Sequence, residues 1–177
     1  MDEPRVGIWV DADNTELSLR DIEKRLNFER FIAWVQDYYR VTSIVSFDYF
    51  LSANNAQFLQ KLEYKLKRIR GYLHSYPITA GHGYSDEVVI ADVTKRADDY
   101  DVVVLLTSDG DFDQLVRELT SRGKQVMRCA VSGFYSDHSN WCSDSEVAIL
   151  LDELGDLVLD QWDRPGFKIL PKLHRPA

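Results

Sequence analysis

The chain has few of the residues that build disulfide-stabilised or zinc-bound proteins. Its 177 residues include two cysteines, Cys129 and Cys142, and four histidines that form no zinc-binding spacing. No run approaches the roughly 18 apolar residues that a membrane span needs. The acidic N-terminal segment MDEPRVG does not have the pattern of a signal peptide. We therefore expect reduced thiols, a cytoplasmic location and no membrane partner.

The chain also lacks an excess of positive charge. Lysine and arginine number 21 against 29 aspartate and glutamate residues, which gives a formal net charge of −8. This balance argues against a nucleic-acid binder that works through bulk positive charge. It does not exclude a protein that brings divalent cations to its own carboxylates. The positions of the acidic residues therefore matter more than their sum.

Length and composition indicate one ordinary globular domain. Hydrophobic residues make up 45% and charged residues 28% of the chain, and the length allows a sizeable core. No internal repeat, low-complexity tract or linker divides the sequence. We expect one domain over residues 1–160 and a C-terminal tail over residues 161–177.

Strand-like apolar runs alternate with helical patterns along the chain. The run DVVVLLTS at 101–108 is continuous, as in a strand that is buried on both faces of a sheet. The expected strands are 5–11, 41–50, 72–78, 101–108 and 124–133, and the expected helices are 27–39, 55–71, 86–99, 111–123 and 145–159. This alternation predicts an α/β fold with three layers, α/β/α, around a central and mostly parallel sheet.

Acidic residues follow two of the expected strands. Asp11 comes directly after the first apolar run, and Asp109 and Asp111 follow the run at 101–108. Sites in open parallel sheets form beyond the carboxyl ends of the strands, so these residues are expected to share one crevice. Two unit charges 4 Å apart repel by about 4 kcal/mol at an effective dielectric near 20. Mg²⁺ or Mn²⁺ would relieve that repulsion, and such an ion supports phosphate chemistry.

Helix capping is the simpler explanation for several of these acidic residues. Asp13 and Glu16 form a D-x-x-E pattern close to a capping box, and Asp111 or Ser108 could cap the helix at 111–123. Asp86 could likewise cap the helix that follows the GHGYS loop. Capping does not explain Asp11 and Asp109, which stand at the strand ends themselves. We therefore expect a shared acidic site, with Asp86 as its third wall.

Three segments carry a family resemblance. They read VDADN, SDEVVIAD and VLLTSDGDFDQLVRELTSRGKQV. Together they closely resemble the NYN domain family, the LabA-like branch of the PIN-like metal-dependent ribonucleases. The resemblance covers about residues 5–155, although 15–80 match only in the order of elements. It implies a PIN-like, Rossmann-like topology and an endoribonuclease that hydrolyses RNA with one or two bound Mg²⁺ or Mn²⁺ ions.

The resemblance also implies which residues form the site. The residues expected to bind metal and to be catalytic are Asp11, Asp86, Asp109 and Asp111. Those expected to support them are Asp13, Asn14, Thr107 and Asp92. Many members of the family have a lysine in a K-G-x-D motif, whereas this chain has Gly83-Tyr84-Ser85-Asp86. His82 is the expected partial replacement for that lysine.

A basic stripe is the candidate surface for RNA, with a single strand the expected form. Lys61, Lys65 and Arg68 have i, i+4 and i+7 spacing in the helix at 55–71, and Tyr64 or Tyr72 could stack on a base. The alternative is a solvated helix face, which the intervening Glu63 favours.

Two other functions remain open at this stage. The sequence DADNT satisfies the D-x-D-x-T signature of haloacid dehalogenase-like phosphatases, in which Asp11 would be a nucleophile and Asp13 its acid/base partner. The long match around Asp109 favours the nuclease. Alternatively, the fold is a catalytically silent binding module. A second copy or a protein partner would then attach through the helix at 145–159 and the tail.

Overall fold

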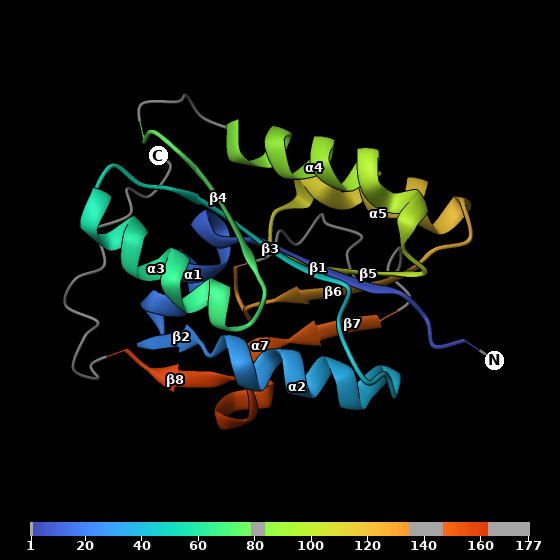
Figure 1. The fold of residues 1–177 in the computed structure, drawn as a ribbon, viewed down its shortest axis with the longest axis horizontal. Coiled ribbons are helices and arrows are strands. Elements are labelled where there is room, and N and C mark those ends of the chain that lie inside the picture. The colour runs from blue at the N-terminus through green and yellow to red at the C-terminus, as the bar shows by residue number, and fades with distance from the viewer. Residues whose placement is uncertain (1, 79–83, 135–146, 163–177) are drawn as a thin grey trace.

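The computed structural model describes residues 2–78, 84–134 and 147–162 (Figure 1). Strands and helices alternate through most of this part of the chain. In order they are β1 Val6–Asp11, α1 Ala12–Asp21, β2 Lys24–Leu26, α2 Phe28–Tyr39, β3 Ser46–Ser52, α3 Ala56–Arg68, β4 Tyr72–Tyr76, α4 Tyr84–Arg96, β5 Val102–Leu106, α5 Asp113–Ser121, β6 Gln125–Ala130, β7 Val147–Leu150, α7 Leu151–Leu154 and β8 Leu159–Gln161. Short 3-10 turns cover Ala97–Asp99, Gly110–Phe112 and Gly155–Leu157.

A six-stranded sheet forms the centre of the fold. Its order is β4-β3-β1-β5-β6-β7, and every neighbouring pair is parallel. β1 therefore lies between β3 and β5, and Asp11 at its end is in register with Phe50 of β3. Because all the strands run the same way, their carboxyl ends lie along one edge of the sheet. The expected α/β fold with a parallel sheet is confirmed.

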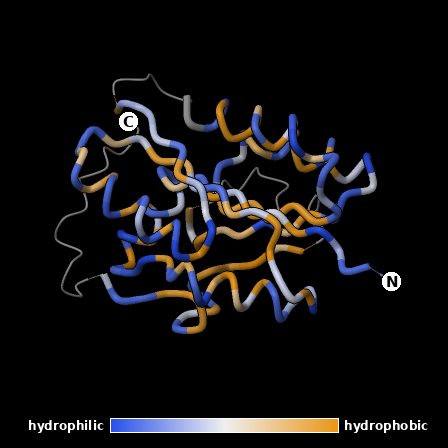
Figure 2. The backbone as a smooth tube through the Cα atoms, in the orientation of Figure 1, coloured by the Kyte–Doolittle hydropathy of each residue, from blue (hydrophilic) through white to orange (hydrophobic). Residues whose placement is uncertain are grey.

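Helices cover both faces of this sheet (Figure 1). α4 and α5 pack on one face over Trp9, Val103 and Leu105, whereas α1, α2 and α3 pack on the other face over Ile8 and Val10. Figure 2 shows the hydrophobic stretches concentrated in the central strands. All five residues of β5 are buried, as expected for a strand covered on both sides.

The helix expected over 145–159 is wrong. Val147–Leu150 instead forms β7, which pairs in parallel with β6 at the edge of the sheet. Of the described residues 147–159, only Leu151–Leu154 is α-helical. The apolar run VAILL satisfies a strand as well as a helix, and Val147 and Ile149 pack against the core as strand residues. The long C-terminal helix that was expected to bind a partner is therefore not present in the described part of the chain.

A second sheet of two strands was not expected. β2 and β8 pair antiparallel, with Lys24 opposite Gln161, and the amide of Trp162 donates to the carbonyl of Glu23. Gln161, the first residue of the expected tail at 161–177, is thus part of a strand. Residues 163–177 lie outside the described part of the chain.

Candidate functional site

Three carboxyl groups meet at the carboxyl edge of the central sheet. Asp86 comes from the first turn of α4, and Asp109 and Asp111 come from the segment between β5 and α5. One carboxylate oxygen of each residue lies within 4.8 Å of those of the other two. Asp86 and Asp109 are half-buried and Asp111 is exposed. We refer to these three residues as the acidic triad.

Asp109 organises its own segment of the triad. Its side chain caps the 3-10 turn by accepting a hydrogen bond of 2.9 Å from the amide of Asp111. The cap is Asp109 and neither Asp111 nor Ser108, so the expectation that capping does not explain Asp109 is wrong. Asp109 also shares a hydrogen bond with the carboxyl group of Asp86. Asp109 therefore has hydrogen bonds with both of the other residues of the triad, through the amide of Asp111 and the carboxyl group of Asp86.

Asp11, which was expected to share the site, is buried and is not one of the three residues whose carboxylate oxygens lie within 4.8 Å of one another. Its side chain is at the end of β1 with 1% relative exposure. Oδ2 accepts a hydrogen bond of 3.0 Å from the hydroxyl of Thr107, whereas Oδ1 has no hydrogen-bond partner in the described part of the chain. The charges of Asp11 and Asp109 act on each other, and Asp11 also acts on Asp86. The site thus contains a buried carboxylate oxygen that lacks the partner such a group normally requires.

The crowding of these carboxyl groups raises two pKa values. Burial is the main cause for Asp11, whose pKa rises to about 7, and the charge of Asp13 adds to this rise. The hydrogen bonds from Thr107 and from the backbone of Asn14 oppose it. Burial is also the first cause for Asp86, whose pKa rises to about 9. The hydrogen bond with Asp109 and the neighbouring negative charges raise the pKa of Asp86 further. Without a cation, the triad therefore holds a proton near neutral pH.

Two residues just after β1 link α1 to β3 and β5, the strands that flank β1. Asp13 accepts hydrogen bonds from the amide and the hydroxyl of Ser52 at the end of β3, at 2.9 and 2.6 Å. Asn14 accepts one of 2.7 Å from the amide of Ser108, which follows β5. The two side chains therefore fix the positions of two neighbouring strand ends. The fixed end of β5 leads directly into the triad segment.

The next two residues of α1 continue this pattern. The hydroxyl of Thr15 donates to the carbonyl of Leu106 at 2.9 Å, and the buried carboxyl of Glu16 accepts from the hydroxyl of Tyr49 at 3.0 Å. Burial raises the pKa of Glu16, and the Tyr49 hydrogen bond opposes that rise. The capping-box interpretation of Asp13 and Glu16 is wrong, since both side chains bind β3.

Thr107 links Asp11 to the triad segment. Its hydroxyl donates to Asp11 and accepts a hydrogen bond of 3.2 Å from the amide of Asp109. The structure therefore places Thr107 and Asn14, two expected supporting residues, in direct contact with the site or the segment that carries it.

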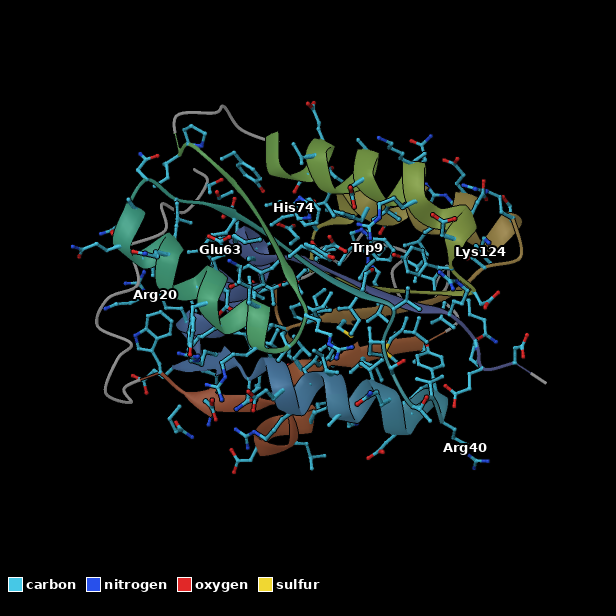
Figure 3. The ribbon with its side chains drawn as sticks, viewed as in Figure 1. Trp9, Arg20, Arg40, Glu63, His74 and Lys124 are labelled. Carbon is cyan, nitrogen blue, oxygen red and sulfur yellow. The ribbon has the colours of Figure 1, made fainter. Side chains whose placement is uncertain are left out.

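Asp92 has different partners. Its Oδ2 accepts from Trp9 Nε1 at 2.8 Å and from Arg96 at 2.9 Å. Arg96 also pairs with the buried Asp48, which is hydrogen-bonded to His74 at 2.8 Å. Trp9 and His74 lie between α4 and the sheet in Figure 3. This network fastens α4 to the sheet, and Asp92 belongs to it rather than to the triad.

The basic stripe lies away from the triad. Lys61, Lys65 and Arg68 are exposed on α3, which covers the face of the sheet opposite α4 (Figure 1). Partial burial and the nearby Arg25 lower the pKa of Lys65, whose acidic neighbours include Glu16. The structure does not bring the stripe together with the triad. His82 lies outside the described residues.

Arg128 is a site neighbour that sequence reasoning missed. This residue of β6 is fully buried, and its guanidinium group donates to the Asp113 carboxylate and to the backbone carbonyl of Asp109. An arginine inside the apolar strand segment QVMRCAV, one strand away from the acidic loop, was the available signal. Its contacts with Asp109 and Asp113 could not be predicted from the sequence, because they depend on how β6 packs against the loop.

The sequence profile of the NYN domain matches residues 5–147. The chain therefore belongs to the NYN domain family, which lies within the PIN-like nuclease superfamily. None of the curated proteins matches the chain. No helix in residues 2–78, 84–134 and 147–162 is long and apolar enough to cross a bilayer.

Solved structures with a similar fold include one from a bacterium. It is the crystal structure of a protein of unknown function from Vibrio parahaemolyticus, with 20% sequence identity and a TM-score of 0.73. The similarity covers 89% of this chain and 97% of that one. It supports the three-layer α/β/α architecture around the parallel sheet.

The geometry argues against the phosphatase alternative. A nucleophilic Asp11 would have to reach a phosphate, but its side chain is 1% exposed. An acid/base Asp13 would need a carboxyl group facing that phosphate, whereas both of its oxygens accept hydrogen bonds from Ser52. The family membership points in the same direction.

Proposed function

We propose that the chain is a divalent-metal-dependent endoribonuclease that hydrolyses RNA phosphodiester bonds at the acidic triad. The observation that carries this proposal is the convergence of Asp86, Asp109 and Asp111 within 4.8 Å of one another, beside Asp11. Membership of the NYN domain family supports the same class of reaction.

The residues present fit a divalent cation. Carboxylate oxygens are the ligands that Mg²⁺ and Mn²⁺ prefer, and the triad offers three. Oδ1 of Asp11 is buried without a hydrogen-bond partner among the described residues. Burial, the hydrogen bond with Asp109 and the neighbouring negative charges raise the pKa of Asp86, and a cation would offset those charges. A bound ion would supply an activated water and stabilise the charge that develops on the phosphate.

The chain's own residues would hold and orient these ligands. Asp86, Asp109 and Asp111 would bind the ion, and Asp11 would bind it from the buried side. The Thr107 hydroxyl donates a hydrogen bond to the Asp11 carboxylate and accepts one from the amide of Asp109. These hydrogen bonds set the ligand positions before substrate arrives, which reduces the reorganisation needed during the reaction.

Single-stranded RNA is the substrate that we propose. Asp111 is exposed, so a flexible phosphodiester strand can approach the triad from that side. Lys61, Lys65 and Arg68 are on α3, which covers the face of the sheet opposite α4, so we propose that they contact RNA outside the triad. Three expectations remain predictions. They are a role for His82 in binding the substrate, a role for the tail at 161–177 in binding a partner, and a cytoplasmic location.

The first experiment measures cleavage of labelled RNA with Mn²⁺ or Mg²⁺ and with EDTA. We expect cleavage of single-stranded RNA that EDTA abolishes and that falls at least 100-fold in Asp109→Asn, because that change removes a charged ligand. Asp98→Asn is the matched control. The Asp98 side chain is 83% exposed, pairs with Arg122 and is not part of the triad.

The same assay separates the alternatives. Release of phosphate from small phosphomonoesters without RNA cleavage would favour the phosphatase. Tight binding of RNA that EDTA does not change, without turnover, would favour a silent binding module. Parallel reactions with single-stranded DNA decide whether the 2′-hydroxyl is required.

A further inference from the structure

Arg128 is a fully buried cation beneath the triad segment. It lies on β6, where its neighbours Met127 and Cys129 are also buried. Nη1 donates to the carboxylate of Asp113, and Nη2 donates to the backbone carbonyl of Asp109. One guanidinium group therefore fastens both ends of the segment from Asp109 to Asp113.

Stability alone is a weak reason for an arginine at this position. Buried ion pairs are often no more stabilising than well-packed apolar residues of similar volume, because both charges must leave water. In addition, Nε of Arg128 is buried without a hydrogen-bond partner among the described residues. An apolar side chain on β6 would avoid both penalties. The reason for an arginine at this position must therefore lie in the groups that it binds.

The segment that Arg128 holds carries two members of the triad. β5 ends at Leu106, so Asp109 and Asp111 lie beyond the regular hydrogen bonds of the sheet. The segment has other contacts: the amide of Asp109 donates to Thr107, the amide of Asp111 donates to Asp109, and Phe112 is buried in the core. Just before the segment, Ser108 is held by Asn14 and by the amide of Val131. Arg128 ties this segment to β6 with a planar, rigid fork.

We propose that Arg128 is a positioning residue for the acidic triad. It holds the backbone of Asp109 and the start of α5 so that Asp109 and Asp111 face Asp86 at the spacing that a divalent cation requires. Ligand positions must be held to about 0.5 Å for such a site, which two contacts from one rigid group provide. The consequence for metal binding rests on the proposed function, whereas the effect on the segment does not.

The test compares two double variants that each remove one ion pair and leave the net charge unchanged. Arg128→Met with Asp113→Asn releases the triad segment. Arg30→Met with Asp160→Asn removes the pair between α2 and β8 as a control. Mn²⁺ affinity is measured by electron paramagnetic resonance, and hydrogen–deuterium exchange is followed in peptides that cover residues 107–113.

We expect the first double variant to bind Mn²⁺ at least tenfold more weakly and to lose exchange protection selectively at 107–113. The control should keep its Mn²⁺ affinity within twofold. Arg128→Lys should show an intermediate loss of affinity, because one ammonium group does not bridge the Asp113 carboxylate and the Asp109 carbonyl. If the double variant does not fold, Arg128→Lys and Asp113→Asn as single changes are read in the same way.

Two results would overturn the role of Arg128. One is unchanged Mn²⁺ affinity together with unchanged protection at 107–113. The other is a uniform loss of protection across the domain, which indicates a purely structural ion pair. If the unaltered protein binds no Mn²⁺, the proposed function fails, and the exchange pattern alone decides whether Arg128 positions the segment.

Discussion

The aspartate side chains at this site differ in their burial and in their hydrogen-bond partners. Asp11 is enclosed at the end of β1, Asp86 shares a hydrogen bond with Asp109, and Asp111 is exposed to solvent. Burial and mutual repulsion raise the pKa of Asp11 and Asp86, so each of these carboxyl groups lowers stability when it ionises.

Asp11→Asn should stabilise the metal-free protein at high pH. The pKa of Asp11 is about 7 in the folded protein against an ordinary 3.8, so the folded state binds more protons. Stability is therefore lost as pH rises from about 4 through 7. From pH 5 to pH 8 the loss amounts to about 2–3 kcal/mol, so the variant's Tm advantage should grow by roughly 5–10 °C.

Differential scanning calorimetry with EDTA at both pH values checks this change. Asp98→Asn again serves as the control, because its exposed carboxylate should give the same Tm difference at pH 5 and pH 8. A pH-independent Tm difference for Asp11→Asn would show that the carboxyl group is not strained by burial.

At the scale of elements, α1 acts as a clip across the sheet. Its residues 13–16 bind the strands on both sides of β1, through Ser52 and Tyr49 on β3 and through Leu106 and Ser108 at the end of β5. Because these contacts are to strand ends, they fix where the segment after β5 begins. Asp13 is thus a structural member of the site.

Asp13→Asn should leave RNA cleavage within about threefold of the unaltered protein. The side-chain oxygen of asparagine still accepts from the amide of Ser52, so the clip is weakened by about 0.5–1.5 kcal/mol. Cleavage rates and chemical denaturation, measured side by side, check both parts. A loss of activity comparable to that of Asp109→Asn would give Asp13 a direct chemical role, as the phosphatase alternative requires.

Local patterns predicted the elements that have a long, unambiguous period. The continuous run in β5 and the spaced apolar residues of α2 and α3 are examples. The run VAILL fitted two periods, and its pairing with β6 decided for a strand. β2 and β8 are three residues each and exist only through each other, so no local pattern predicts them.

The same distinction holds for the site. Strand ends and the family motif predicted that Asp11, Asp86, Asp109 and Asp111 share a site. The structure brings Asp86, Asp109 and Asp111 together, whereas Asp11 is not one of that group. Arg128 was not predictable in this way. Its role depends on contacts to Asp113 and Asp109, which only the packing of β6 against the loop creates.

At the scale of the whole molecule, the parallel sheet gathers negative charge at one edge. The strand order places β1 beside β5, and α4 brings Asp86 from the segment after β4 to the same place. With a net charge of −8, the bare protein would repel an RNA backbone. A divalent cation at the triad would reverse the local charge where the phosphate must approach.

Mn²⁺ should therefore stabilise the protein, and more strongly at pH 8 than at pH 6. The pKa of Asp86 is about 9, so a proton competes with the cation for this carboxyl group, and the competition weakens as pH rises. At an ion concentration of 100 times Kd the gain is about 2.7 kcal/mol, or roughly 5–10 °C in Tm.

Thermal unfolding with and without Mn²⁺ at both pH values measures this effect. Asp109→Asn should abolish most of the shift while Asp98→Asn retains it. A shift that is equal at the two pH values would mean that the ion does not displace a proton from Asp86.

The central claim is that Asp86, Asp109 and Asp111, with Asp11 beneath them, hold a divalent cation. The most direct measurement is a crystal structure with Mn²⁺ and its anomalous difference density. The account predicts a peak about 2 Å from carboxylate oxygens of the triad. Density elsewhere on the protein, or none at the triad at saturating Mn²⁺, would contradict it.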